Sequence, residues 1–186
     1  HFHYNLGGVH LDDGDLPRAV REFELAVEEV PYHVPYLNGL SYALIKLGRT
    51  EEARPIVERA LKQHPESADA IYNLGLIAYL QGDTPQAVAH FETVARITPS
   101  YNSDYFRFRF GDALERNGNV DEAERQYSTV FRFFTNRDLD SLSANQEDAA
   151  LLKGFAYLFI TAYMFGQAES FYRRALQLWP DYPEAH

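Results

Sequence analysis

The feature that most constrains this chain is a spacing of 34 residues that recurs along the sequence. Three series of identical residues keep this spacing: Ala19, Ala53 and Ala87; Gly14, Gly48 and Gly82; and Pro31, Pro65 and Pro99. The tetrapeptide Tyr-Asn-Leu-Gly occurs at residues 4–7 and 72–75, which is twice the same distance. Such self-similarity is typical of an array of small units that stack on one another.

One unit, residues 69–99, predicts two helices joined by a tight turn. Its first stripe has the i, i+3, i+4, i+7 spacing of an amphipathic helix: Ile71, Leu74, Gly75 and Ala78. Gly82 is placed to end that helix, and Asp83 or Thr84 to cap the next one. The second stripe is Ala87, Phe91 and Val94, and Pro99 closes the unit.

Glycines inside the first helices predict a close approach. Gly7, Gly75 and Gly111 occupy positions where glycine costs roughly 0.5–1 kcal/mol relative to alanine. We expect a helix to accept this cost where another backbone comes near. Small and aromatic residues of the second helices are expected to face the partner helix: Ala19, Ala53, Ala87, Ala123 and Ala168, beside Phe23, Phe91, Tyr127 and Tyr172.

This pattern resembles the tetratricopeptide repeat family, in which a large apolar residue, Leu-Gly, an aromatic residue, Ala-x3-Phe and a closing proline follow one another. The third unit shows it as Ile71, Leu74-Gly75, Ala78, Ala87, Phe91 and Pro99, and the fourth as Arg107, Phe110-Gly111, Leu114, Ala123 and Tyr127. The resemblance implies an all-α, right-handed α-solenoid of about five helix-turn-helix units, with antiparallel helix pairs and a concave groove lined by first helices. Residues 1–186 would form one array, with units at approximately 1–33, 34–67, 68–101, 104–137 and 143–182.

The later units depart from the strict spacing. Two residues are inserted before the fourth unit, and residues 138–148 form a longer insertion before the fifth. Ser143 and Gln146 have the spacing of a capping box, so we expect an unusually long first helix in the fifth unit. Residues 183–186 resemble the start of a sixth unit. A chain that starts and stops in mid-pattern is expected to be a piece of a longer array or to pack its ends against a neighbour.

The resemblance implies that the groove is lined by the side of the first helices opposite to their packing stripe. The residues expected there as a partner-binding site are Tyr4, Asn5, Asn38, Tyr42, Tyr72, Asn73, Tyr79, Tyr105, Phe108, Arg109 and Tyr157. Aromatic faces take apolar side chains, and amides bond a peptide backbone, so this lining favours an extended polypeptide. The alternative for Asn5 and Asn73 is a bond within the array. Family members that clamp a chaperone's terminal carboxylate use five basic and amide positions, of which Asn73 and Arg109 match two.

Charge and composition narrow the class of partner. The net charge of -10 disfavours nucleic acid and anionic membrane surfaces. The chain has no cysteine, which excludes disulfides and thiolate chemistry. The longest apolar run, residues 155–165, is too short to insert across a bilayer. Compartment is left open, because cytoplasm and periplasm are both compatible with these features.

Catalytic patterns are missing from the sequence. Residues 10–16 resemble a metal loop but fail the calcium spacing, so an acidic turn with a capping aspartate is expected. His33, His64 and His90 are expected to be solvated. We therefore predict no catalytic residue, cofactor or metal. Three hypotheses follow: a scaffold that binds a protein or peptide, a self-association module with homo-oligomer contacts through end helices, and the regulatory array of a longer enzyme such as a glycosyltransferase or sulfotransferase.

Overall fold

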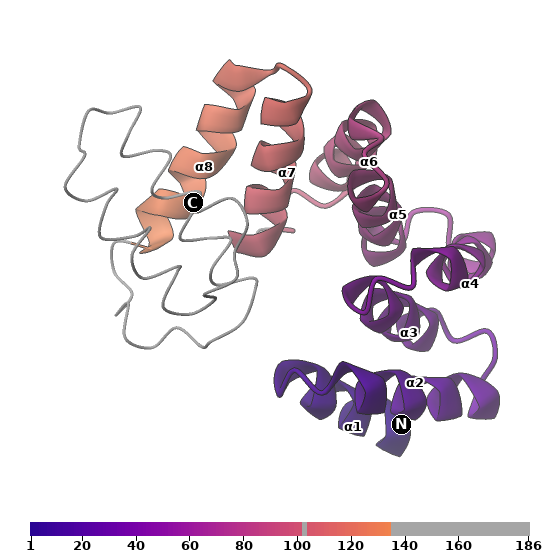
Figure 1. The fold of residues 1–186 in the computed structure, drawn as a ribbon. Coiled ribbons are helices and arrows are strands. Elements are labelled where there is room, and N and C mark those ends of the chain that lie inside the picture. The colour runs from indigo at the N-terminus through magenta and orange to yellow at the C-terminus, as the bar shows by residue number, and fades with distance from the viewer. Residues whose placement is uncertain (102–103, 135–186) are drawn as a thin grey trace. The chain divides into compact units, whose positions relative to one another are not determined.

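The structure is a computed structural model that describes residues 1–101 and 104–134, and these residues form eight α-helices and no strand (Figure 1). In chain order the helices are α1 (Phe2–Asp12), α2 (Leu16–Glu29), α3 (Val34–Lys46), α4 (Thr50–Gln63), α5 (Ala68–Leu80), α6 (Thr84–Ile97), α7 (Asp104–Arg116) and α8 (Val120–Phe134). The chain separates into two compact units, residues 1–101 and 102–186. From here on, the first unit and the second unit are these two parts of the chain, and a single repeat is called a helix pair. The expected all-α helical-repeat solenoid is confirmed. The described residues do not include the predicted fifth repeat, the insertion at 138–148 or residues 183–186. The division into five repeats stays a prediction.

Each helix pair turns at a glycine with a left-handed backbone. The φ angle is +76° at Gly14 and Gly48, +78° at Gly82 and +83° at Gly118. At the second turn the Gly48 amide donates to the Ile45 carbonyl, and the Arg49 amide donates to the Leu44 carbonyl, both at 2.9 Å. These bonds satisfy carbonyl groups at the end of α3 that have no partner inside the helix. The periodic glycines therefore mark the turns, as the sequence predicted.

Aspartate side chains begin two of the second helices. The Asp15 carboxylate accepts from the Arg18 amide at 3.3 Å, which confirms an aspartate cap in the acidic turn. Asp83, and not Thr84, caps α6 by accepting from the Gln86 amide at 3.2 Å.

Within a pair, an aromatic ring of the second helix lies on the glycine of the first. A Cβ atom added to Gly7 would come within 2.8 Å of the Phe23 ring, and one added to Gly75 within 2.5 Å of the Phe91 ring. The predicted approach of another backbone is therefore wrong, because the atoms nearest these glycines belong to side chains. The flat ring fills the space that a missing side chain leaves. The alanines at 19, 53, 87 and 123 are fully or almost fully buried, as expected.

In the second helix pair, other residues occupy the positions of the glycine and the aromatic ring. Ser41 stands where the other first helices carry glycine, and Val57 stands where the second helices carry an aromatic residue. Both are fully buried. A larger residue on one helix is thus matched by a smaller residue on the other, which lets the two side chains fill the same buried space.

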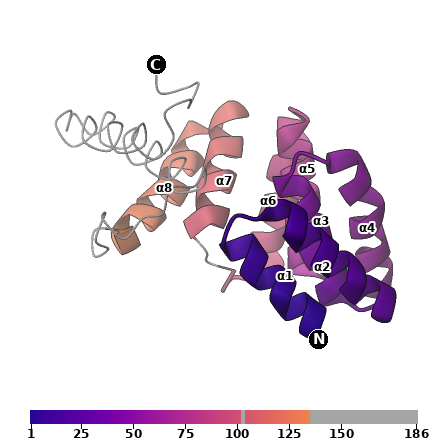
Figure 2. The same ribbon diagram turned by 60° about the horizontal axis from the view of Figure 1, so that its bottom comes forward.

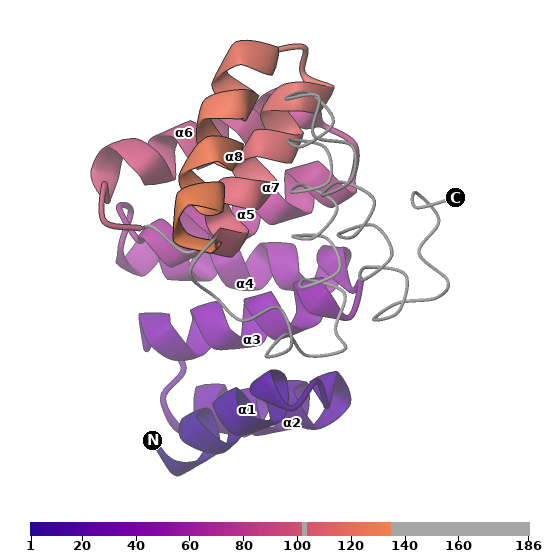
Figure 3. The ribbon, with the colours of Figure 1, turned by 90° about the vertical axis from the view of Figure 1, so that its left-hand side faces the viewer.

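The three pairs of the first unit stack in chain order (Figures 1 and 3). Each second helix packs on the next first helix, α2 on α3 and α4 on α5, while α3 also contacts both α1 and α5 (Figure 2). The first helices therefore form a continuous layer in which each one touches the next. In the second unit α7 packs on α8, where a Cβ atom on Gly111 would come within 2.6 Å of the Tyr127 ring.

Candidate partner-binding face

The residues predicted to line a groove separate into two sets in the first unit. The exposed or partly exposed set is Tyr4, Asn5, Tyr42 and Tyr79. The buried set is Asn38, Tyr72 and Asn73. Their position on the first helices was predicted from the period, but their exposure depends on the helix that stacks against each one.

The buried amides connect α3 to α5. Asn73 Nδ2 donates to the Asn38 main-chain oxygen at 3.2 Å and to Ser41 Oγ at 2.9 Å. Ser41 Oγ donates to the same Asn38 oxygen at 3.1 Å, and Asn38 Nδ2 donates to Ser67 Oγ at 3.2 Å. Asn73 is 2% exposed. The interpretation that asparagine bonds within the array therefore describes Asn73 and Asn38, whose amides hold two successive first helices in register.

Tyr72 belongs to an aromatic cluster at the end of the first unit. Its ring centroid lies 5.7 Å from that of Phe91 and 5.8 Å from that of Tyr101. The Tyr101 hydroxyl donates to Asp69 Oδ1 at 3.0 Å. Burial raises the pKa of the Tyr101 phenol, and the Asp69 carboxylate raises it further because a phenolate beside it would be repelled. The cluster fastens the segment after α6 to α5, so Tyr72 stabilises the unit.

In the second unit the predicted residues show the same division. Tyr105 and Arg109 are partly exposed, whereas Phe108 is buried with its ring centroid 5.8 Å from that of Tyr127. Asp112 Oδ2 lies 2.9 Å from Arg116 Nε, one helical turn along α7. Tyr157 lies outside the described residues.

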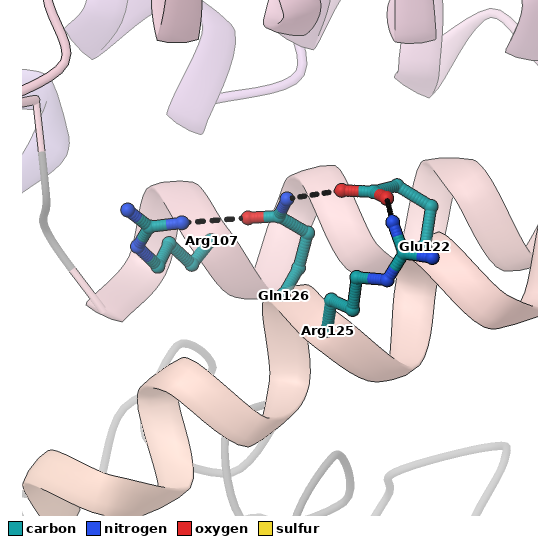
Figure 4. A network of polar contacts seen from close by, with 4 residues as sticks. All are labelled: Arg107, Glu122, Arg125 and Gln126. Atoms are coloured by element: carbon teal, nitrogen blue, oxygen red, sulfur yellow. Dashed lines mark hydrogen bonds and ion pairs between the residues drawn. The ribbon is translucent and has the colours of Figure 1, made fainter.

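A polar contact between the two helices of a pair occurs at the same repeat positions in the first and the fourth pairs, and the sequence analysis did not predict it. In the fourth pair Arg107 on α7 donates to Gln126 Oε1 on α8 at 2.8 Å, and Gln126 donates to Glu122, which also accepts from Arg125 (Figure 4). His3 on α1 contacts Glu22 on α2 at 2.7 Å, with the same separation of 19 residues. Polar residues at both places, 19 apart, are the sequence signal that identifies these bridges.

The second and third pairs place other residues at the two positions of this bridge. The second pair carries Leu37 and Ile56, and the third Ile71 and His90. His90 is half-buried, and burial lowers its pKa, with the nearby Arg54 charge lowering it further and Asp83 opposing both.

The other histidines differ in their surroundings. His64 is exposed as predicted. The prediction that His33 is solvated is wrong, because its ring centroid lies 4.2 Å from that of Tyr36 and its Nδ1 atom is buried. Among residues 1–101 and 104–134, no three His, Asp or Glu side chains are arranged to hold a metal ion. None of the helices in the same residues is long and apolar enough to cross a bilayer.

Two family models match the chain, and both describe the tetratricopeptide repeat. One matches residues 38–102 and the other residues 1–24. Residues 1–24 and 38–102 are tetratricopeptide repeats.

Known proteins resemble this chain in sequence or in fold. The probable biofilm formation methyltransferase WspC of Pseudomonas putida is 36% identical over 92 residues, covering 46% of the chain and 22% of the relative. The crystal structure of a thermophilic tetratricopeptide repeat protein from Thermus thermophilus aligns with a TM-score of 0.70 and 18% identity, covering 98% of this chain and 93% of the other. YrrB, described as having an unusual peptide-binding site, aligns with a TM-score of 0.57 and 20% identity, covering 98% and 88%. The chain spans 8% to 43% of the length of four curated relatives that it matches.

In the first unit, accessible residues recur at the same repeat position on the three first helices. Asp12, Lys46 and Leu80 occupy one repeat position on α1, α3 and α5, and Leu80 is 53% exposed. Tyr42 and Tyr79, both partly exposed, lie on the same helices within one turn of Lys46 and Leu80. We call these five residues the first-helix face. It combines two phenol rings and an aliphatic side chain with one cation and one anion.

Proposed function

We propose that this tetratricopeptide repeat protein is a non-enzymatic scaffold that binds an extended segment of a partner protein on the first-helix face. The observation that carries the proposal is the register of that face, in which accessible residues recur on three first helices that touch one another in sequence. Such a surface suits a partner chain that crosses the helices one after another. The peptide-binding site described for YrrB, which has the same fold, supports this class of partner.

The composition of the face indicates what the segment contains. The rings of Tyr42 and Tyr79 and the side chain of Leu80 offer apolar area, which favours a segment with aliphatic or aromatic residues. Asp12 and Lys46 offer one charge of each sign. The whole chain carries a net charge of -10, so the face is less acidic than the molecule as a whole and does not require a basic partner.

Binding can be tested with peptides selected from a random display library on the folded chain. Fluorescence anisotropy would compare one selected peptide against wild type, Tyr42→Ala and Leu80→Ala, with Glu58→Ala on the exposed side of α4 as the control. Anchor residues at interfaces cost about 1–2 kcal/mol or more on truncation, so we expect roughly 5- to 30-fold weaker binding for the face variants. Equal affinity for all four chains, with unchanged circular dichroism, would reject this face as the site.

Asn73 and Tyr72 are unsuitable for this experiment although the sequence placed them in the groove. Both are buried, so their substitution changes the stability of the array before it changes any contact with a peptide.

A second candidate function is the regulatory array of a longer enzyme. The match to a methyltransferase over 22% of that relative's length is the observation that favours it. The test is to delete residues 1–186 from the full-length protein and measure the activity of the remainder. A change in activity on deletion would support regulation, and an intact, unaltered activity would reject it.

A further inference from the structure

The first-helix face contains a row of three residues at the ends of three helices. Asp12, Lys46 and Leu80 are the last residues of α1, α3 and α5. Helix α3 contacts both α1 and α5, so the three helix ends follow one another along one edge of the layer of first helices (Figure 3). Asp12 and Leu80 are exposed and Lys46 is partly exposed. A segment that crosses this edge therefore meets an anion, a cation and an aliphatic side chain in that order.

The distance between neighbouring helices selects the conformation of such a segment. The axes of packed helices lie about 8–10 Å apart. A polyproline II helix has three residues per turn and rises about 3.1 Å per residue, so its residues i, i+3 and i+6 lie on one side at steps of roughly 9 Å. A β-strand turns every second residue to one side, at steps of about 6.6 Å or, for every fourth residue, about 13 Å. A polyproline II segment therefore keeps in step with α1, α3 and α5, whereas a strand does not.

Two tyrosines of the face provide the surface that this conformation prefers. Tyr42 lies one turn before Lys46 on α3, and Tyr79 directly precedes Leu80 on α5. Proline-rich segments in the polyproline II conformation dock on surfaces lined by aromatic side chains. Proline also fixes this conformation before binding, which lowers the entropy lost on association. The composition of the face thus favours proline at the positions between the three residues that meet the row.

The charge of Asp12 opposes the local preference of its helix. The carbonyl end of a helix carries partial negative charge, so an anion is unfavourable as the last residue of α1, whereas Lys46 is favourable as the last residue of α3. Residues that oppose a local rule are typical of functional sites. A cation on the bound segment would balance the exposed Asp12 carboxylate.

We infer that the first-helix face binds a proline-rich segment in the polyproline II conformation that carries a basic, an acidic and an aliphatic residue three positions apart. The basic residue lies opposite Asp12, the acidic residue opposite Lys46 and the aliphatic residue opposite Leu80. The inference rests on the proposed function, because it names the kind of segment that this face binds. The charges of the row set the order of the three residues, and the helix spacing sets their separation.

Synthetic peptides test the order of the charges. Fluorescence anisotropy at low salt compares Lys-Pro-Pro-Glu-Pro-Pro-Leu with a control in which Lys and Glu are exchanged, each also synthesised in the reverse order. The protein chains are the wild type and the double variant Asp12→Lys, Lys46→Asp, which keeps the net charge of -10 and one charge of each sign at the same two helix ends. We expect the wild type to bind a matched peptide at least about fivefold more tightly than its control, and the double variant to reverse this preference.

A third peptide tests the separation of the three residues. Lys-Pro-Glu-Pro-Leu-Pro-Pro has the same composition but places the contacting residues two positions apart. We expect the wild type to bind it at least about fivefold more weakly than the matched peptide, because the second ion pair and the aliphatic contact are lost. Equal affinity for these two peptides would overturn the polyproline II spacing.

The remaining outcomes separate this inference from the proposed function. Equal affinity of the matched and exchanged peptides for the wild type would overturn the charge order, and this comparison decides the test if circular dichroism shows the double variant to be unfolded. If a library-selected peptide binds and is weakened by Tyr42→Ala while none of the proline peptides binds, the inference is wrong and the proposed function stands. Failure of every peptide to bind would reject both.

Discussion

The contact between Gly75 and Phe91 gives the sharpest test of how the helix pairs pack. A Cβ atom on Gly75 would lie 2.5 Å and 2.7 Å from two ring carbons of Phe91, which is fully buried. Ordinary carbon contacts are about 3.5–4.0 Å, so the ring must retreat by roughly 1 Å into a filled core. Overpacking of this kind costs about 1–3 kcal/mol, and the better helix propensity of alanine returns about 0.5–1 kcal/mol. We expect Gly75→Ala to lower the free energy of unfolding by about 1–2 kcal/mol.

Gly8→Ala is the matched control for this substitution. It makes the same chemical change inside a first helix, but a Cβ atom at Gly8 has nothing within 4 Å. It should therefore stabilise the chain by about 0.5–1 kcal/mol through helix propensity alone. Urea denaturation followed by circular dichroism measures both. If Gly75→Ala proves as stable as Gly8→Ala, the ring is not held against the glycine and the packing argument is refuted.

The second helix pair suggests a rescue of the same contact. Ser41 and Val57 occupy the places of Gly75 and Phe91 one repeat earlier and are fully buried together. The double variant Gly75→Ser, Phe91→Val should therefore lose less stability than the sum of its two single variants. The coupling is measured by a double-mutant cycle, and strict additivity would show that the two positions do not compensate.

Three further predictions follow from the described contacts. Asn73→Ala should cost about 1–3 kcal/mol in urea denaturation because it removes two buried hydrogen bonds, whereas the exposed Asn5→Ala should stay within about 0.5 kcal/mol. Gly48→Ala should lower the melting temperature, at a cost of about 1 kcal/mol, since its φ of +76° strains any other residue; no change would mean that the turn relaxes freely. His90 has a lowered pKa, so its neutral form stabilises the fold above the unfolded pKa of about 6.5, and that contribution is lost as pH falls below this value. His90→Gln should flatten the loss of stability below about pH 6.5, and an unchanged pH profile would contradict the assignment.

Local sequence pattern determined the helices and turns of this protein. Glycine at a fixed interval needs only its own backbone to end a helix, and an aspartate cap bonds an amide three residues ahead, so both features are readable without knowing the neighbours. The recurring alanines and aromatic residues also predicted which side of each second helix is buried. The sequence did not predict that the Phe91 ring is the group nearest to Gly75. A glycine is required whether an aromatic ring or a backbone lies against the helix, so the glycine alone does not distinguish the two.

The accessible surface was decided by the stacking of one pair on the next. Asn5 and Asn73 belong to the same tetrapeptide, yet Asn73 is buried in bonds to α3, whereas Asn5 is exposed. The partners of Asn73 stand 32 and 35 residues away, beyond the reach of any local pattern. The sequence by itself determined that both residues lie on first helices, and the tertiary structure alone decided which is free, since burial is a property of the neighbouring helix pair.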